Sequence, residues 1–275
     1  MDSKREAEGK TKIIWSTANK DVVLIENKDD ITAGDGARRD VIEHKGILAT
    51  ETTCNCFSLL NAKGIPTHFL ERESERRFLA RKVKMIPIEL VPRRIATGSY
   101  LKRHPEVVEG TIFDSLIVEP FYKDDSLNDP IMVWCKKRRC FELYDAKKPN
   151  WAGYFFDLNP RTILISQGQP FGEKEMEELR DITCNVFLIL ERAWKKLDVA
   201  LVDLKIECGW TSANLIVVAD VIDNDSWRIW PGGDKSQMKD KQVYRDLEGT
   251  TAEAIEAIKK NYAWVAEATK KFVHL

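Results

Sequence analysis

The segment VDLKIECG, residues 202–209, carries a charged side chain at every second position of a stretch that is otherwise apolar. Successive side chains of a β-strand point to opposite faces, so Asp203, Lys205 and Glu207 are expected to share one face. The residues between them are apolar and predict a face that is buried in the core. Because a polar face is often simply solvated in an antiparallel sheet, this motif alone favours neither a solvated face nor a chemical site.

The next apolar segment, LIVVADVIDNDSW from Leu215, is interrupted by Asp220. Two strands over residues 199–208 and 215–222, joined by GWTSAN, predict a β-hairpin. Strands of one sheet lie ~4.8 Å apart, so Asp220 is expected near the charged face. Two or three carboxylates beside one lysine are costly to bury unless a cation neutralises them. Oxygen ligands without His or Cys suit Mg²⁺, which is usually held by one or two carboxylates and substrate phosphates. The pattern therefore predicts a nucleotide-phosphate site.

The overall composition is that of a globular protein without a long-range charge bias. Of the 275 residues, 43 are Lys or Arg and 44 are Asp or Glu, and 43% are hydrophobic. This balance gives no general attraction to nucleic acid or to anionic membranes. No signal peptide or run of ~18 apolar residues occurs. We therefore expect a soluble, cytoplasmic protein with no nucleic-acid or membrane partner.

The six cysteines are irregularly spaced and form no C-x-x-C pair, and only four histidines are present. This arrangement argues against a zinc site. Cys54 and Cys56, in TTCNCFSLL, are open to interpretation as a redox pair, but reduced thiols packed on a helix are the favoured interpretation.

The periodicity along the chain predicts an α+β protein with two lobes. The N-terminal part is expected to hold a strand at residues 22–25, a polar loop around Gly34 and Gly36, a helix at 46–62 ended by Gly64, and a strand at 67–70. We expect residues 1–86 to form a small lobe that covers the nucleotide. Residues 87–275 are expected to form a larger lobe with the substrate and metal site.

The C-terminal part shows two helical patterns. Apolar residues from Met176 to Ala193 recur at three- and four-residue steps and predict one long amphipathic helix. The closing helix begins with TTAE, where Thr250 and Glu253 have the spacing of a capping box. Residues 136–160 show no clean period and are interpreted as loop and irregular strand.

Two further stretches suit anion binding. EGKTK places two lysines, Lys10 and Lys12, beside a glycine at the edge of a predicted strand, which favours phosphate. A solvated terminus is the more common meaning of such a stretch. In MIPIELVPRRIATGSYLKRH, two prolines predict an edge or an end of a strand. Arg93 and Arg94 then precede a helix that opens at Ser99, which predicts an anion site, with a surface hairpin carrying solvated arginines as the alternative.

The segments MIPIELVPRRIATGS and LVDLKIECG resemble the two signature segments of the SAICAR synthetase family. EGKTK, DDITAGDGARRD, KDDSLNDP and VIDNDSWRIW also resemble that family and occur in the same order. The match covers most of the chain and is most like the N-terminal synthetase domain of the animal bifunctional enzyme, whose second half is a carboxylase. The resemblance implies a two-lobed SAICAR synthetase-like fold with mostly antiparallel sheets and flanking helices, similar to the kinase arrangement.

The resemblance implies an ATP-dependent ligase that joins L-aspartate to carboxyaminoimidazole ribonucleotide, with ATP and Mg²⁺ as cofactors. It assigns residues to the nucleotide, namely Lys10, Lys12, Met85, Glu89 and Lys123. Glu207 and Asp220 match the metal-binding carboxylates of the family, and Asp203 and Lys205 are expected to face the reacting groups. The substrate-binding positions are expected to be Asp35, Arg93, Ser99, Asp129 and Arg228.

The implied chemistry begins with phosphoryl transfer from ATP to a carboxylate, followed by attack of the aspartate amine on the acyl phosphate. Asp203 is the candidate base for the amine proton because it neighbours Lys205. The family signature usually ends in EFG, whereas this chain has Cys208, on the side expected to be apolar. We expect a homo-oligomer, with a carboxylase domain as a potential fusion partner.

Two alternatives remain at this point. An inositol-phosphate kinase also uses a D-x-K strand, but GDGARRD and KDDSLNDP argue against it. A non-catalytic nucleotide-binding module is the second alternative. The intact candidate metal ligands argue against that module, because such carboxylates are costly to keep without a function.

Overall fold

The computed structural model describes residues 4–34, 36–149, 152–162, 171–247 and 249–274. The chain forms two compact units. The first contains residues 1–83, 189–201 and 221–275, and the second contains residues 84–188 and 202–220. The second unit thus begins at Lys84, and the division into a nucleotide-covering lobe and a substrate lobe stays a prediction. The chain then returns to the first unit, an organisation that the linear division into residues 1–86 and 87–275 does not contain.

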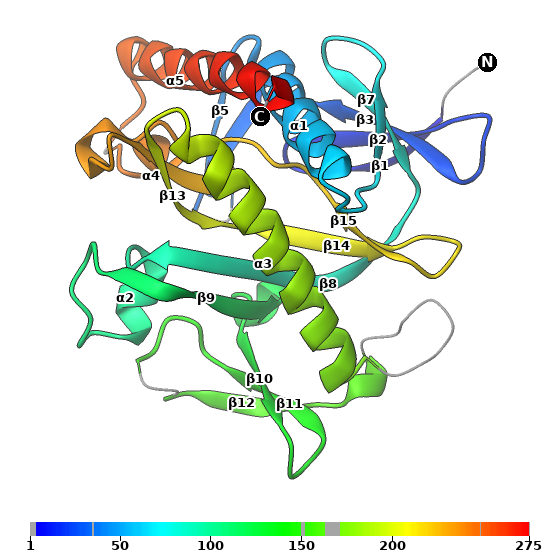
Figure 1. Cartoon of the computed structure of the whole chain (residues 1–275), viewed down its shortest axis with the longest axis vertical. Coiled ribbons are helices and arrows are strands. Elements are labelled where there is room, and N and C mark those ends of the chain that lie inside the picture. Colours follow the sequence, from blue (N-terminus) through cyan, green and yellow to red (C-terminus); the bar gives the residue numbers. More distant parts are fainter. Residues whose placement is uncertain (1–3, 35, 150–151, 163–170, 248, 275) are drawn as a thin grey trace. The chain divides into compact units, whose positions relative to one another are not determined.

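The first unit is built on an antiparallel sheet with the strand order β1-β2-β3-β7-β6 (Figure 1). Its strands are β1 (Arg5–Glu8), β2 (Lys12–Ser16), β3 (Val22–Asn27), β6 (Phe69–Arg72) and β7 (Arg77–Arg81). A separate hairpin pairs β4 (Asp30–Ala33) with β5 (Arg38–Val41). The polar loop expected around Gly34 and Gly36 is the turn of this hairpin. The unit also contains β16 (Trp227–Pro231).

The helices of the first unit are α1 (Lys45–Ala62), α4 (Gln242–Arg245) and α5 (Ala252–Lys270), and α1 packs against α5. The α1 helix ends at Ala62, and Gly64, with a φ of 82°, follows its C-cap and donates its N–H to the carbonyl of Asn61. The predicted cap of α5 is wrong by one residue. Thr251, not Thr250, is the N-cap, and its hydroxyl accepts a 3.2 Å hydrogen bond from the N–H of Ala254.

A buried polar cluster in the first unit fixes the loop before β16. The carboxylate of Asp225 accepts a 2.8 Å hydrogen bond from Lys241 and a short one from the Tyr262 hydroxyl, and it lies 3.8 Å from the ammonium of Lys45. Lys45 is only 2% exposed. Burial alone would raise the pKa of Asp225, but Lys45 and Lys241 outweigh burial and lower it.

The second unit holds an antiparallel sheet in which β12, β11, β10, β9 and β8 follow one another, with β13 and β14 on the far side of β8 and β15 beside β14. These strands are β8 (Lys84–Ile95), β9 (Ile112–Tyr122), β10 (Ile131–Cys135), β11 (Cys140–Tyr144), β12 (Tyr154–Leu158), β13 (Val199–Leu204), β14 (Ile206–Trp210) and β15 (Ile216–Ala219). The interpretation of residues 136–160 as loop and irregular strand is wrong in part. The segment contains β11 and β12, and β11 pairs in regular register with β10.

The position expected for the proline-containing strand is also wrong, because β8 lies inside the sheet and pairs on both sides. A proline has no N–H for a sheet ladder, so an interior strand tolerates it only at an irregularity. Each of the two prolines lies at such an irregularity. Pro92 lies where the ladder beside β8 is interrupted, between the pairs Asp203–Arg93 and Ile206–Leu90, and Pro87 lies opposite the register shift between Glu207 and Gly209.

The long helix α3 (Glu173–Lys195) confirms the predicted amphipathic pattern, since Met176, Leu179, Val186 and Leu190 are all buried. A short helix, α2 (Ser99–Arg103), follows β8. Within the ranges that the structure describes, 3₁₀ turns lie at Asp125–Leu127, Pro160–Thr162, Lys235–Gln237 and Lys271–His274. Among the described residues, the helices are all too short or too polar to cross a membrane.

Candidate active site

Three carboxylates and two lysines meet on one face of the second unit's sheet. Glu207 on β14 lies directly opposite Glu89 on β8, so the two side chains share a face. The ammonium of Lys205 lies 3.3 Å from Glu89 and forms a short hydrogen bond with Glu207. Lys123, just beyond β9, donates a 2.7 Å hydrogen bond to the other oxygen of Glu207. The charges predicted to lie on one face of residues 202–209 therefore do so.

Asp220 joins this cluster through an unusual backbone conformation. Its carboxylate lies 3.8 Å from the ammonium of Lys205. Ala219 lies opposite Glu207 in the hairpin, so strand alternation alone would turn Asp220 to the apolar face. Asp220 has a φ of 62°, the left-handed region that few residues other than glycine adopt. This backbone conformation returns the carboxylate to the charged face, and an uncommon conformation at this place supports a functional role.

The electrostatics of the cluster keep both lysines protonated. Burial alone would lower the pKa of Lys205, but the carboxylates of Glu207, Asp220 and Glu89 outweigh burial and raise it. Burial alone would also lower the pKa of Lys123, but the attraction of Glu207 outweighs burial and raises it. The side chain of Glu207 is only 4% exposed and lies in ion pairs with both ammonium groups.

The donor set fits Mg²⁺. Glu207 and Asp220 supply oxygen atoms only, which is the chemistry that Mg²⁺ prefers, and both approach the same ammonium group. Within the described residues, no group of three or more His, Cys, Asp or Glu side chains is arranged to hold a metal ion. A pair of carboxylates therefore suits a Mg²⁺ ion whose remaining ligands are phosphate and water oxygens.

A second, fully buried charged network lies on the same face of the sheet. Arg93 on β8 is opposite Asp203 on β13 and donates a 2.8 Å hydrogen bond to its carboxylate. Arg93 also donates a 2.6 Å bond to Glu119 on β9 and approaches the hydroxyl of Ser99 at 3.4 Å. Arg103 of α2 donates to both oxygens of Glu119, at 2.7 and 2.6 Å. The structure thus brings three predicted site residues, Arg93, Ser99 and Asp203, together.

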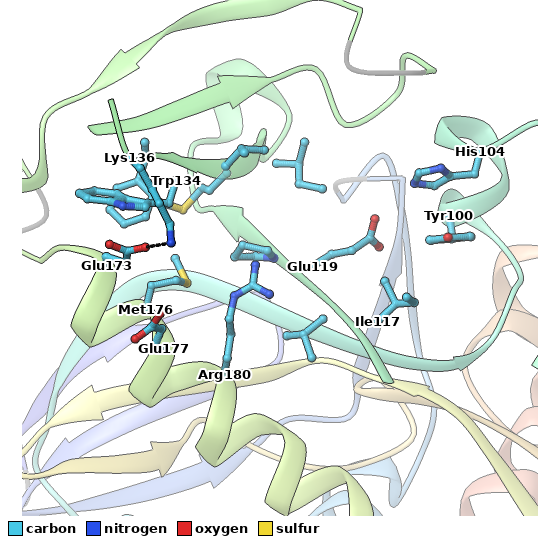
Figure 2. A pocket seen from close by; sticks show the side chains of 16 residues that line it. Tyr100, His104, Ile117, Glu119, Trp134, Lys136, Glu173, Met176, Glu177 and Arg180 are labelled. Carbon is cyan, nitrogen blue, oxygen red and sulfur yellow. Dashed lines mark ion pairs between the residues drawn. The ribbon is translucent and has the colours of Figure 1, made fainter. Parts of the chain in front are cut away.

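Glu119 and Arg103 were not among the predicted site residues. A signal for Glu119 is present, because it is the lone charge in the apolar run LIVEPF. Glu119 borders a cavity of about 640 Å³ in the second unit. Figure 2 shows Tyr100, His104 and Glu119 at one end of this cavity and Trp134, Lys136 and Glu173 at the other, with Arg180 of α3 between them.

The remaining predicted residues are more scattered. Met85 is 40% exposed on β8. Asp129 uses its carboxylate to accept a 2.9 Å hydrogen bond from the N–H of Asp124, which closes the loop that follows Lys123. Cys208 is fully buried on the apolar side, as predicted.

Four predicted residues belong to the first unit. A Cβ added at Gly36 would lie 3.7 Å from Cε of Lys10, so this lysine packs against the turn between β4 and β5. Lys12 begins β2, and Arg228 on β16 donates a 3.2 Å hydrogen bond to Gln242. Asp35 lies outside the described residues.

Comparison with known proteins gives consistent matches over nearly the whole chain. A family model described as SAICAR synthetase matches residues 5–262. The phosphoribosylaminoimidazole-succinocarboxamide synthase of Chloroflexus aurantiacus is 46% identical over 266 residues, which cover 96% of this chain and 95% of that protein. The multifunctional protein ADE2 of Gallus gallus is 45% identical over 96% of this chain and 57% of its own length. A SAICAR synthetase structure in complex with ADP aligns with a TM-score of 0.73 and 30% identity, over 94% of this chain and 97% of that one.

Proposed function

The chain belongs to the SAICAR synthetase family, and we propose that it joins L-aspartate to carboxyaminoimidazole ribonucleotide, with ATP converted to ADP and phosphate. The product is the succinocarboxamide of de novo purine biosynthesis. The observation that carries this proposal is the cluster of Glu89, Lys205, Glu207 and Asp220 within a chain that matches the family from residue 5 to residue 262.

The charged cluster supports a role in binding the phosphates of ATP. Glu207 and Asp220 would hold Mg²⁺, which neutralises phosphate charge when bound. Lys205 and Lys123 remain protonated beside them and supply positive charge to the transferring phosphoryl group. Glu89 and Met85, at the start of β8, match the family positions beside adenine. Lys10 and Lys12 match its phosphate-contacting lysines, a role that rests on the sequence alone.

The reaction requires activation of a carboxylate, because a carboxylate is a poor acyl donor. An oxygen of the ribonucleotide carboxylate attacks the γ-phosphorus, and ADP leaves. The aspartate amine then attacks the acyl carbon, and phosphate departs with one of the original carboxylate oxygens. The ammonium of Lys205 is suited to stabilise the charge that develops in the first step.

The second network supports a role in holding the ribonucleotide. Arg93 and Ser99 match family positions that contact its phosphate or carboxylate, and a guanidinium suits either group. Asp203 remains the candidate that receives the amine proton. Its carboxylate lies 2.8 Å from the guanidinium of Arg93, so Asp203 is also the partner of a proposed substrate-binding residue. Asp35, Asp129 and Arg228 complete the proposed substrate-binding residues.

The acyl-phosphate step is tested by isotope transfer. Carboxyaminoimidazole ribonucleotide labelled with ¹⁸O in its carboxylate is converted with ATP, Mg²⁺ and L-aspartate, and the released phosphate is examined by mass spectrometry. One ¹⁸O atom in each phosphate is expected. Unlabelled phosphate would refute the acyl-phosphate intermediate while leaving the overall ligase reaction intact.

The proposal also includes a cytoplasmic homo-oligomer. Light scattering on the purified chain decides the oligomeric state. In the multifunctional relative of Gallus gallus, the matched region makes up 57% of the protein, which supports the idea that this fold also functions within a longer chain.

A further inference from the structure

Glu119 is the shared acceptor of two buried arginines. Its Oε2 accepts a 2.6 Å hydrogen bond from Nε of Arg93, and both of its oxygens accept bonds from Nη2 of Arg103. Nε of Arg103 adds a bond of 3.0 Å to Oε1. The carboxylate is therefore held from two sides, by a strand residue and by a residue of α2.

Burial makes this network costly to disturb. The side chains of Arg93, Arg103, Glu119 and Asp203 are 3%, 4%, 6% and 4% exposed. The two guanidinium groups balance the two carboxylates, so the network has no net charge as a whole. Removal of one member leaves an uncompensated buried charge, which is far more costly than the loss of a surface pair.

The network ties together the elements that carry Arg93 and Ser99. Arg93 lies on β8, Glu119 on β9 and Arg103 in the last turn of α2, whose first residue is Ser99. Nη1 of Arg103 also donates a 2.9 Å bond to the carbonyl of Ala146, beyond β11. Glu119 thereby fixes the direction of the Arg93 guanidinium and the placement of α2 with one side chain.

We propose that Glu119, supported by Arg103, is a positioning residue for ribonucleotide binding, because it aims Arg93 and sets the Arg93–Ser99 pair. This inference rests on the proposed function, in which Arg93 and Ser99 contact the ribonucleotide. Glu119 itself carries a negative charge that is already neutralised by two arginines, so it acts through Arg93 and not by contact with an anionic substrate.

The test uses steady-state kinetics of Glu119→Gln and Arg103→Lys with the substrates varied one at a time. Glu119→Gln keeps the shape of the side chain and removes its charge. Arg103→Lys keeps the charge and removes the planar two-pronged contact. We expect KM for carboxyaminoimidazole ribonucleotide to rise about 10- to 100-fold in each variant, because a misplaced binding group costs this much. KM for ATP is expected to stay within about twofold.

Arg72→Lys is the matched control, because Arg72 on β6 donates to the backbone carbonyls of Ser74 and Glu75 and belongs to none of the proposed binding residues. Its KM values are expected to equal those of the wild type. The double variant Glu119→Gln/Arg103→Lys is expected to raise KM for the ribonucleotide by less than the product of the two single increases, since both residues act through one network.

Folding is monitored by circular dichroism, and Arg103→Lys keeps the test decisive if Glu119→Gln does not fold. An unchanged KM for the ribonucleotide in a folded variant would overturn the inference. An equal rise in all KM values would also overturn it, because that result indicates general damage. If the wild type itself makes no succinocarboxamide, the proposed function fails instead.

Discussion

The carboxylate of Asp220 lies 3.8 Å from the ammonium of Lys205, although strand alternation would place it on the opposite face of the sheet. The left-handed backbone at Asp220, with a φ of 62°, makes this approach possible. Asp enters this region more readily than most non-glycine residues, but the conformation is still uncommon. This uncommon backbone conformation brings a second carboxylate to Lys205 and Glu207. It therefore supports a metal-binding role for Glu207 and Asp220.

Asp220→Asn tests this role. Asn also tolerates the left-handed backbone, so the fold is expected to persist while one metal-binding charge is lost. We expect turnover at fixed Mg²⁺ to fall about 100-fold, with partial recovery at higher Mg²⁺, since loss of support for a bound metal commonly costs 10- to 100-fold in affinity. The measurement is the initial rate of ADP release over a Mg²⁺ titration.

Asp234→Asn serves as its control, because Asp234 is a surface residue whose carboxylate caps a 3₁₀ turn. This variant is expected to match the wild type at every Mg²⁺ concentration. If Asp220→Asn behaves like Asp234→Asn, Asp220 is not a metal ligand.

Asp203→Asn separates two roles for Asp203. Loss of the base that accepts the amine proton would lower kcat by about 100-fold or more with little change in KM. Loss of the Arg93 partner would instead raise KM for the ribonucleotide, because the guanidinium would lose a 2.8 Å contact. Since the structure shows the ion pair between Asp203 and Arg93, we expect a rise in KM together with a smaller fall in kcat. A fall in kcat without a rise in KM would show that Asp203 acts as the base and does not position Arg93.

The Asp225 cluster predicts an acid-sensitive contribution to stability. The pKa of Asp225 is lowered in the folded chain because Lys45 and Lys241 outweigh burial, which acts in the opposite direction. A lowered pKa stabilises the fold above the ordinary carboxyl pKa of about 3.9, and this stability is lost as the pH falls through the folded value. Asp225→Asn is expected to lower the free energy of unfolding by about 3–5 kcal/mol at pH 7.

The difference in the free energy of unfolding between the wild type and Asp225→Asn should become smaller as the pH is lowered from 5 to 3. Urea unfolding followed by tryptophan fluorescence at several pH values measures it. A gap that stays constant over this range would show that the charge of Asp225 is not the source of the stability.

The six thiols are expected to differ in reactivity. Burial raises the pKa of Cys54 and of Cys208 to about 12, and it also raises the pKa of Cys56, Cys140 and Cys184. Four thiols are buried, and only Cys135 and Cys184 are partly exposed. With Ellman's reagent at pH 8, no more than two thiols per folded chain should react quickly, and all six should react in urea. Rapid reaction of three or more would contradict the described packing of α1 and β14.

The charged face of residues 202–209 was predictable because strand alternation depends only on local sequence, and Asp203, Lys205 and Glu207 do share a face. The approach of Asp220 was predicted from proximity along the hairpin, but its cause, the left-handed φ, is not visible in the sequence. The interior position of β8 was missed for a related reason. Proline argues against an interior strand unless its partner is irregular, and the break at Lys205 is a property of the partner.

The contacts that could not be predicted join residues that are far apart in the chain. Glu119 is recognisable as a lone charge in an apolar run, but its two arginine partners, Arg93 and Arg103, are 26 and 16 residues away in the chain. No local pattern indicates which of the many charges in the sequence meet. The same is true of the return of residues 221–275 to the first unit, which depends on packing between α1 and α5.

The ligase assignment is tested most directly by measuring ADP release from ATP and Mg²⁺ with carboxyaminoimidazole ribonucleotide, with and without L-aspartate, and by identifying the product by mass. The account predicts ADP release that depends on aspartate and a succinocarboxamide product in equal amount, both abolished in Glu207→Gln. ADP release without that product, or transfer of phosphate to an inositol phosphate, would contradict it.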